Sequence, residues 1–220
     1  MAVINQFKTT SLADQVFERL ENDIIQGAYP KGVILTELKL VEQLGVSRTP
    51  IREALRRLEQ ERLIEDTGKG SRVLGITEED LLDIMTIRER IEGVAAYHAA
   101  KNMAPEDLEG LTHIVDLQEF YFSKGDAEHL QQVDDQFHDT ICILSRRNVL
   151  MDTLIPLHRK TRRYRRQSME DWSRTTNTKR EHYEIYQAMA SGNAELAQEL
   201  TAQHITNAKN HMLERMKNNG

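Results

Sequence analysis

The sequence predicts a mainly α-helical protein, in which an N-terminal winged helix-turn-helix is followed by an all-α antiparallel helical bundle. Apolar residues recur every three or four positions along most of the chain, which has only 11 Gly and 4 Pro in 220 residues. Short extended segments occur only before residue 75, on either side of a basic helix. These observations predict two domains, residues 1–75 and residues 76–220.

The composition is typical of a soluble globular protein, with 39% hydrophobic and 29% charged residues. Cys142 is the single cysteine and lies in an apolar run, so we expect a buried thiol and no intramolecular disulfide. Residues 1–10 lack a signal-peptide pattern, and no stretch of 18 apolar residues occurs. We therefore expect a cytoplasmic protein with no membrane partner.

The net charge of −6 is unevenly distributed. Residues 1–75 hold as many basic as acidic side chains, so the excess of acid lies entirely in residues 76–220. Within residues 47–57, four arginines accompany a single glutamate. A basic face on a neutral domain favours interaction with a polyanion such as DNA.

The first two elements are helices. A cap at Ser11 and an apolar stripe predict a helix that ends near Gly27. A turn and a short extended run follow over residues 29–35. Thr36 then caps a second helix over residues 37–44.

A tight turn leads from the second helix to the third. Gly45 is free of Cβ strain in a left-handed conformation, Ser47 can cap the third helix, and Pro50 fits its first turn. The buried face of this helix is predicted to carry Ile51, Leu55 and Leu58, and the opposite face Arg48, Arg52 and Arg56. Arginines four residues apart project from one side of a helix, so they can follow a DNA groove.

Residues 65–74 are predicted to form two strands around a glycine-bearing tip, where Lys69 would meet the DNA backbone or minor groove. A basic helical face alone is usually solvated surface. The prediction of a DNA-binding domain therefore depends on the ordered combination of turn, basic helix and wing.

Residues 45–55, GVSRTPIREAL, closely resemble the signature of the GntR superfamily of transcription regulators, and the resemblance extends over roughly residues 10–74. It implies contacts with double-stranded DNA from Ser47, Arg48, Thr49, Arg52, Lys69 and Gly70. Many members have an arginine early in the second helix, whereas this chain has Leu38. Sequence preference is therefore expected to depend more heavily on the third helix and the wing.

Beyond residue 75, helical periodicity dominates. Thr77 followed by three acidic residues is a strong helix start, Pro105 fits a first helical turn, and Gly125 and Gly192 mark helix ends. We expect helices over residues 77–101, 105–124, 126–145, 147–168, 176–191 and 193–217.

Four side chains of this bundle suggest a divalent metal site. Asp134 and His138 lie four residues apart and share a helix face, while His182 and His204 lie in apolar patterns on two later helices. One carboxylate and three imidazoles suit a divalent ion, although the spacing equally allows hydrogen-bonded core histidines. The other histidines are interpreted as structural: His98, His113, His129, His158 and His211.

Residues 134–138, DDQFH, and the segment 181–204 resemble the effector domain of the FadR-like (FCD) branch of GntR regulators. The resemblance implies a zinc, nickel or manganese ion held by Asp134, His138, His182 and His204. It also implies that a small carboxylic acid binds against the ion.

For this effector site the resemblance indicates Arg88, which matches an arginine of the first bundle helix, and Asn148. An ion pair between Arg88 and Glu92 on one helix face is an equally good interpretation of the same residues. Arginines 146 and 147 replace the small residues usual before Asn148. The basic run over residues 159–166 goes round its helix, so it predicts a solvated or effector-facing surface rather than a second DNA site.

The sequence thus predicts a homodimeric, ligand-controlled transcription regulator, with a repressor favoured, because reading a palindromic operator requires two recognition helices. Two alternatives use the same four candidate metal ligands. The protein could sense the ion itself, or it could be a metalloenzyme, which is disfavoured because the sequence offers no convincing general base.

Overall fold

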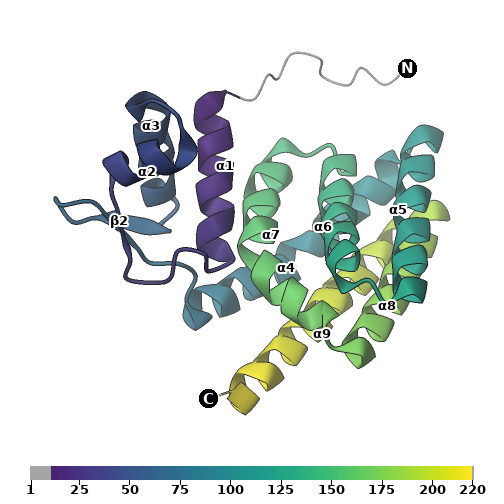
Figure 1. The fold of residues 1–220 in the computed structure, drawn as a ribbon. Helices are drawn as coiled ribbons and strands as arrows, with labels where there is room; N and C mark the ends of the chain where they lie inside the picture. Colours follow the sequence, from purple (N-terminus) through teal and green to yellow (C-terminus); the bar gives the residue numbers. More distant parts are fainter. Residues whose placement is uncertain (1–10, 220) are drawn as a thin grey trace. The chain divides into compact units, whose positions relative to one another are not determined.

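The computed structural model describes residues 11–219; the first ten residues, where no signal-peptide pattern was found, and residue 220 lie outside the described residues. The chain divides into two compact units, residues up to Thr77 and residues from Glu78 onward. The fold class is as predicted: a winged helix-turn-helix and an all-helical unit (Figure 1). In the described part of the chain, none of the helices has the length and apolar character needed to cross a membrane.

The N-terminal unit begins with helix α1 (Leu12–Ile25). Its start is fixed by a capping box, in which the Ser11 hydroxyl accepts from the Asp14 amide and the Asp14 carboxylate accepts from the Ser11 amide. Helix α2 (Glu37–Leu44) follows strand β1 (Ile34–Leu35) and ends at Gly45 in the left-handed conformation. These elements lie where the sequence predicts them.

Helix α3 (Arg48–Gln60) begins after Ser47, but the Ser47 side chain makes no capping hydrogen bond, contrary to the prediction. The physical reason is local. A capping hydroxyl accepts from the amide of the second or third helical residue, and the third residue here is Pro50, which has no amide hydrogen. The Ser47 hydroxyl, on an exposed residue, is therefore available to another partner.

The wing is a small antiparallel sheet of order β1-β3-β2, with β2 at Ile64–Asp66 and β3 at Ser71–Val73. Gly70 lies at its tip with φ +141°. A Cβ on this residue would come within 2.7 Å of the Leu35 carbonyl oxygen in β1. Glycine is therefore required at this position for the wing to pack against β1.

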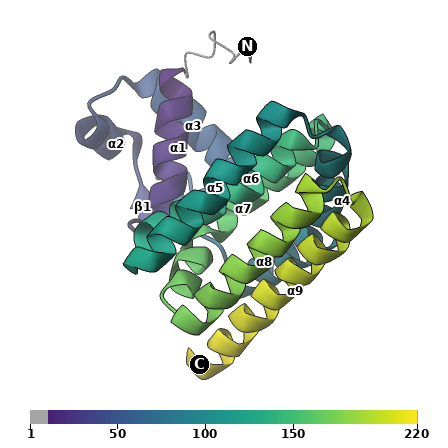
Figure 2. The ribbon, with the colours of Figure 1, turned by 90° about the vertical axis from the view of Figure 1, so that its right-hand side faces the viewer.

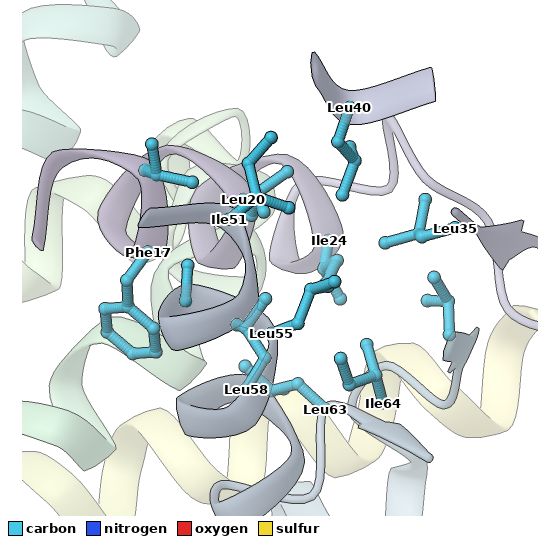
Figure 3. Packing of buried hydrophobic residues seen from close by; sticks show 13 residues of the cluster. Phe17, Leu20, Ile24, Leu35, Leu40, Ile51, Leu55, Leu58, Leu63 and Ile64 are labelled. Carbon is cyan, nitrogen blue, oxygen red and sulfur yellow. The ribbon is translucent and has the colours of Figure 1, made fainter. Parts of the chain in front are cut away.

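One hydrophobic core joins α1, α2, α3 and the sheet, as Figure 3 shows. Leu20, Ile51, Leu58 and Leu63 are fully buried there. Burying a leucine or isoleucine side chain stabilises a fold by roughly 1.5–3 kcal/mol. This core fixes the orientation of α3, so its other face remains exposed.

The described part of the C-terminal unit contains six helices: α4 (Glu78–Asn102), α5 (Pro105–Lys124), α6 (Ala127–Leu144), α7 (Asn148–Met169), α8 (Trp172–Ala190) and α9 (Ala194–Asn219). The predicted helices match these to within a few residues, and α8 differs most. It begins at Trp172 rather than at residue 176, because the Asp171 carboxylate accepts from the amides of Ser173 and Arg174 and caps it there.

Helices α8 and α9 lie side by side in this unit, and α4 packs along α9 (Figure 2). Helices α4 and α9 approach closely at Gly93, where a Cβ would lie 2.6 Å from the Gln198 carbonyl oxygen. A glycine inside a helix lowers helix propensity, so its place here is explained by packing.

Replacing Gly93 with alanine is expected to destabilise the protein by about 1–3 kcal/mol, because the added methyl group forces α4 and α9 apart. Gly110 in α5 is the matched control, since a Cβ there meets nothing within 4 Å. Gly110→Ala should stabilise by about 0.5–1 kcal/mol through helix propensity. Urea unfolding monitored by circular dichroism measures both, and equal changes in the two variants would contradict the close approach.

Candidate DNA-binding surface and metal centre

The exposed face of α3 carries the side chains that the sequence indicated for DNA contact. Ser47, Arg48, Thr49 and Arg52 are all exposed, whereas Pro50 and Ile51 between them are buried. The alternation arises because the apolar side of the helix packs into the core. Four polar or basic side chains therefore face solvent together on the first turn and a half of α3.

Arg52 is held by α2, because its Nε donates to Glu37 Oε1 at 2.8 Å. This hydrogen bond holds the pKa of Glu37 below its usual value. Arg57 behaves differently from the other arginines of the helix. Its guanidinium lies over the Phe17 ring, 4.0 Å from the centroid, and donates to Asp14 at 2.6 Å. The basic face therefore consists of Arg48, Arg52 and Arg56.

A groove runs between α3 and the wing, and Arg52, Arg56, Lys69 and Gly70 line it. The structure thus places the wing-tip residues beside the outer face of the basic helix. Arg56 was assigned to this face from its spacing but not to the site itself. Its position in the groove adds it to the candidate DNA contacts.

Three histidines from three helices meet inside the C-terminal unit: His138 from α6, His182 from α8 and His204 from α9. All three are buried. His204 Nε2 lies 3.3 Å from Nε2 of both His138 and His182. Asp134 lies one helical turn before His138, and its Oδ1 is 3.7 Å from His182 Nε2. The structure therefore brings together all four side chains that the sequence indicated.

The outer nitrogen of each ring faces a hydrogen-bonding side chain. Nδ1 of His138 contacts the Glu92 carboxylate, and Nδ1 of His204 lies 2.6 Å from Glu181 Oε2. Such contacts favour a proton on Nδ1 and a lone pair on Nε2, the atom that faces the centre. The Gln118 amide lies 3.0 Å from Nδ1 of His182. Turning this amide by 180° presents its oxygen as the matching acceptor.

The protonation states of the side chains favour binding of a cation at this centre. Burial lowers the pKa of His138 and of His182 well below 6.5, so both rings are neutral at pH 7. Burial acts to raise the pKa of Glu181, but hydrogen bonds from His204 and Arg174 outweigh it and lower this pKa to about 2. Burial is likewise outweighed at Glu92, chiefly by the Arg88 charge, and its pKa lies well below 4.5.

Each of the four buried carboxylates of the described bundle has a guanidinium partner. Arg88 pairs with Glu92 and Arg174 with Glu181, at 2.8 and 2.9 Å. Arg165 lies 3.5 Å from Asp134 Oδ2 and 2.8 Å from Asp135 Oδ1, and the half-buried Arg162 lies 3.2 Å from Asp135 Oδ2. Pairing of this kind offsets part of the cost of burying charge.

The geometry also fits an ion. Two nitrogens bound to one tetrahedral zinc ion at 2.0–2.1 Å lie roughly 3.3 Å apart, as His204 Nε2 does from its two neighbours. Converging lone pairs repel one another unless a cation lies between them. The donor set of imidazoles and one carboxylate suits zinc, nickel or manganese.

A cavity of about 50 Å³ adjoins this centre, and Asp134, His138 and His204 form part of its wall. Arg88 also lines it, and its Nε donates to Glu92 Oε2 at 2.8 Å. Both interpretations of Arg88 are therefore present together, the ion pair and the place beside the cavity. Asn148 is not brought to the cavity, because it is exposed at the first position of α7.

Sequence reasoning missed Glu92, Gln118 and Glu181 as partners of the histidines, and Arg174 as a wall of the cavity. Glu181 had a signal, since it precedes His182 directly, and Arg174 lies on the same helix. Glu92 and Gln118 come from helices distant in the sequence, and spacing carries no information on them. The basic run over residues 159–166 divides accordingly: Arg165 is buried against the cavity, while Arg163 and Arg166 are exposed.

Comparison with known protein families assigns both units. Residues 83–207 match the FCD domain, and residues 12–73 match the family of bacterial regulatory proteins named gntR. The chain belongs to the GntR family. The FCD match covers all four candidate metal ligands, and the GntR match covers the basic helix and the wing. The resemblance seen in the sequence is thereby confirmed.

Relatives of this GntR protein are transcription regulators rather than enzymes. A "Probable D-xylose utilization operon transcriptional repressor" of Paenarthrobacter nicotinovorans is 37% identical over 46% of this chain and 45% of its own length. A "Gluconate operon transcriptional repressor" of Bacillus licheniformis is 33% identical over 54% of this chain and 49% of its own. The chain thus spans about half the length of these two relatives.

A solved structure, described as E. coli McbR/YncC, has a TM-score of 0.79 and 24% identity, and the match covers 94% of this chain and 99% of that one. A putative GntR regulator from Rhodococcus sp. RHA1 has a TM-score of 0.71, also at 24% identity, over 93% of this chain and 99% of its own. At this identity the likeness concerns the fold.

The metal-free protein is expected to lose stability as the pH falls below about 6.5. The folded-state pKa values of His138 and His182 lie below that ordinary value, so the unfolded chain takes up protons first and the stability present above pH 6.5 is progressively lost. Urea unfolding at stepped pH in the presence of a chelator measures this loss.

Two variants test whether the buried histidines cause this loss of stability. His182→Gln should make the pH dependence shallower, whereas His113→Gln should leave it unchanged, because His113 is exposed on α5. A metal-free parent whose stability stays level between pH 7.5 and 5.5 would contradict the neutral buried histidines.

Proposed function

We propose that the protein is a homodimeric transcription repressor that binds a palindromic operator in double-stranded DNA. The observation that carries this proposal is the exposed basic face of α3 beside the wing groove. Arginine side chains of this kind bind guanine edges and phosphates in the major groove. Two copies are needed, because each half of a palindrome takes one recognition helix.

We further propose that a divalent ion binds Asp134, His138, His182 and His204. Two features support it: the Nε2 atoms converge at a spacing that suits shared ligands, and carboxylates at Nδ1 of His138 and His204 favour a lone pair on those Nε2 atoms. Four protein ligands complete a tetrahedral site, so an organic acid would have to bind as an additional ligand of an ion with a higher coordination number. Glu92 and Glu181 would orient two of the ligating rings.

The effector is proposed to be a small carboxylic acid that binds in the cavity beside the ion. A volume of about 50 Å³ holds on the order of four water-sized molecules, which excludes long-chain acids. Arg88 and the hydroxyl groups of Thr161 and Thr178 line this space. An acid changes operator affinity only in so far as it binds the DNA-competent and incompetent states differently.

Arg52→Ala is expected to weaken binding to operator by about 1–3 kcal/mol if the side chain contacts a base, and to lower the salt dependence if it contacts phosphate. Arg19→Ala is the matched control, because Arg19 is also an exposed arginine of this unit paired with a carboxylate, but it lies on α1. Gel-shift titrations on DNA upstream of the gene give both affinities. If Arg52→Ala binds as the parent does over the whole salt range, Arg52 makes no contact with DNA.

Elemental analysis of the purified protein is expected to find one divalent ion per chain, and to find it lost in His182→Ala and His204→Ala. Each substitution removes one of four ligands, whereas His113→Ala removes an exposed imidazole and should keep the ion. Equal metal content in all variants would exclude the four-ligand site. Operator affinity that follows the metal concentration without any acid would instead identify the ion as the signal.

A further inference from the structure

Three buried arginines line the cavity beside the histidines, and they differ in how fully they are used. Arg88 donates through Nε and Nη2 to Glu92 and through Nη1 to Thr161. Arg174 donates through both Nη atoms to Glu181, at 2.9 and 3.0 Å. The terminal nitrogens of both groups are therefore engaged.

Arg165 is the exception. Its Nη1 donates to Asp135 Oδ1 at 2.8 Å and lies 3.5 Å from Asp134 Oδ2. The residue is only 8% exposed, and its Nη2 atom is buried without a hydrogen-bond partner in the described structure. Leaving a charged buried donor unsatisfied is costly, so such a group is expected to have a partner in the working protein.

We infer that Arg165 receives the carboxylate of the effector, through Nη2. This rests on the proposed function, in which an acid binds beside the ion. Arg165 is well placed for the task, because it lines the cavity together with Asp134, a proposed metal ligand, and its Nη1 lies 3.5 Å from Asp134 Oδ2. A guanidinium group matches the planar geometry of a carboxylate.

The size of the cavity limits the acid. A volume of about 50 Å³ holds on the order of four water-sized molecules, so a short acid fits and a sugar acid does not.

The probes are lactate and lactamide, which have similar size but carry a carboxylate and a neutral amide, together with gluconate as an acid too large for the cavity. Calorimetric titration of the metal-loaded full chain is expected to give binding of lactate, with lactamide and gluconate not binding. Lactamide binding as tightly as lactate would overturn the role of the carboxylate.

Arg165→Gln should weaken binding of lactate by about 10- to 100-fold, as expected for the loss of a charge-assisted hydrogen bond. The variant should fold, because Asp135 keeps its contacts with Arg162 and Gln131. Arg162→Gln is the matched control: it removes a guanidinium from the same helix and the same carboxylate, but Arg162 does not line the cavity. It should bind the acid as the parent does.

Metal content, measured on every variant, separates the outcomes. A metal-holding parent that does not bind lactate overturns the proposed effector and this inference with it. A parent that binds while Arg165→Gln binds equally well overturns only the role of Arg165. If Arg165→Gln loses the ion, Arg165→Lys is measured in its place. A lysine variant that retains the ion but binds the acid more weakly supports the inference. A lysine variant that also loses the ion shows that Arg165 acts on Asp134 alone.

Discussion

The ion pairs around the histidine cluster are the interaction on which the candidate metal centre depends. Arg88 pairs with Glu92, which contacts His138, and Arg174 pairs with Glu181, which contacts His204. These pairs keep both carboxylates ionised in a poorly solvated interior, and the ionised carboxylates orient the rings. Asp134 lies beside the cluster and has Arg165 as its own guanidinium neighbour.

Charge would link the proposed ion to the proposed acid. A divalent ion held by the histidines would add positive charge beside the cavity, and this charge would attract a carboxylate. By linkage, each of the two partners would then strengthen the affinity for the other.

Much of the fold follows from the sequence, because local signals are strong. The cap at Ser11, the stop at Gly45 and the prolines and glycines between bundle helices define element bounds to within a few residues. Two local predictions were wrong for local reasons. Pro50 has no amide hydrogen to donate to the Ser47 hydroxyl, and the Asp171 carboxylate caps α8 before its predicted start. The one-turn spacing of Asp134 and His138 suggested a site, and the resemblance to the FCD branch indicated all four candidate ligands. Their partners could not be recognised, because Glu92 and Gln118 belong to helices that only the tertiary fold brings near.

The origin of the ligands has a consequence for folding. The candidate ligands come from α6, α8 and α9, and their hydrogen-bonding partners add α4 and α5. Residues as far apart in the chain as Glu92 and His204 must meet before the centre exists, and closing such long loops is entropically costly. The bundle must therefore be largely assembled before it can capture an ion. Metal binding would then stabilise only correctly packed molecules, and misassembled ones would stay susceptible to proteolysis.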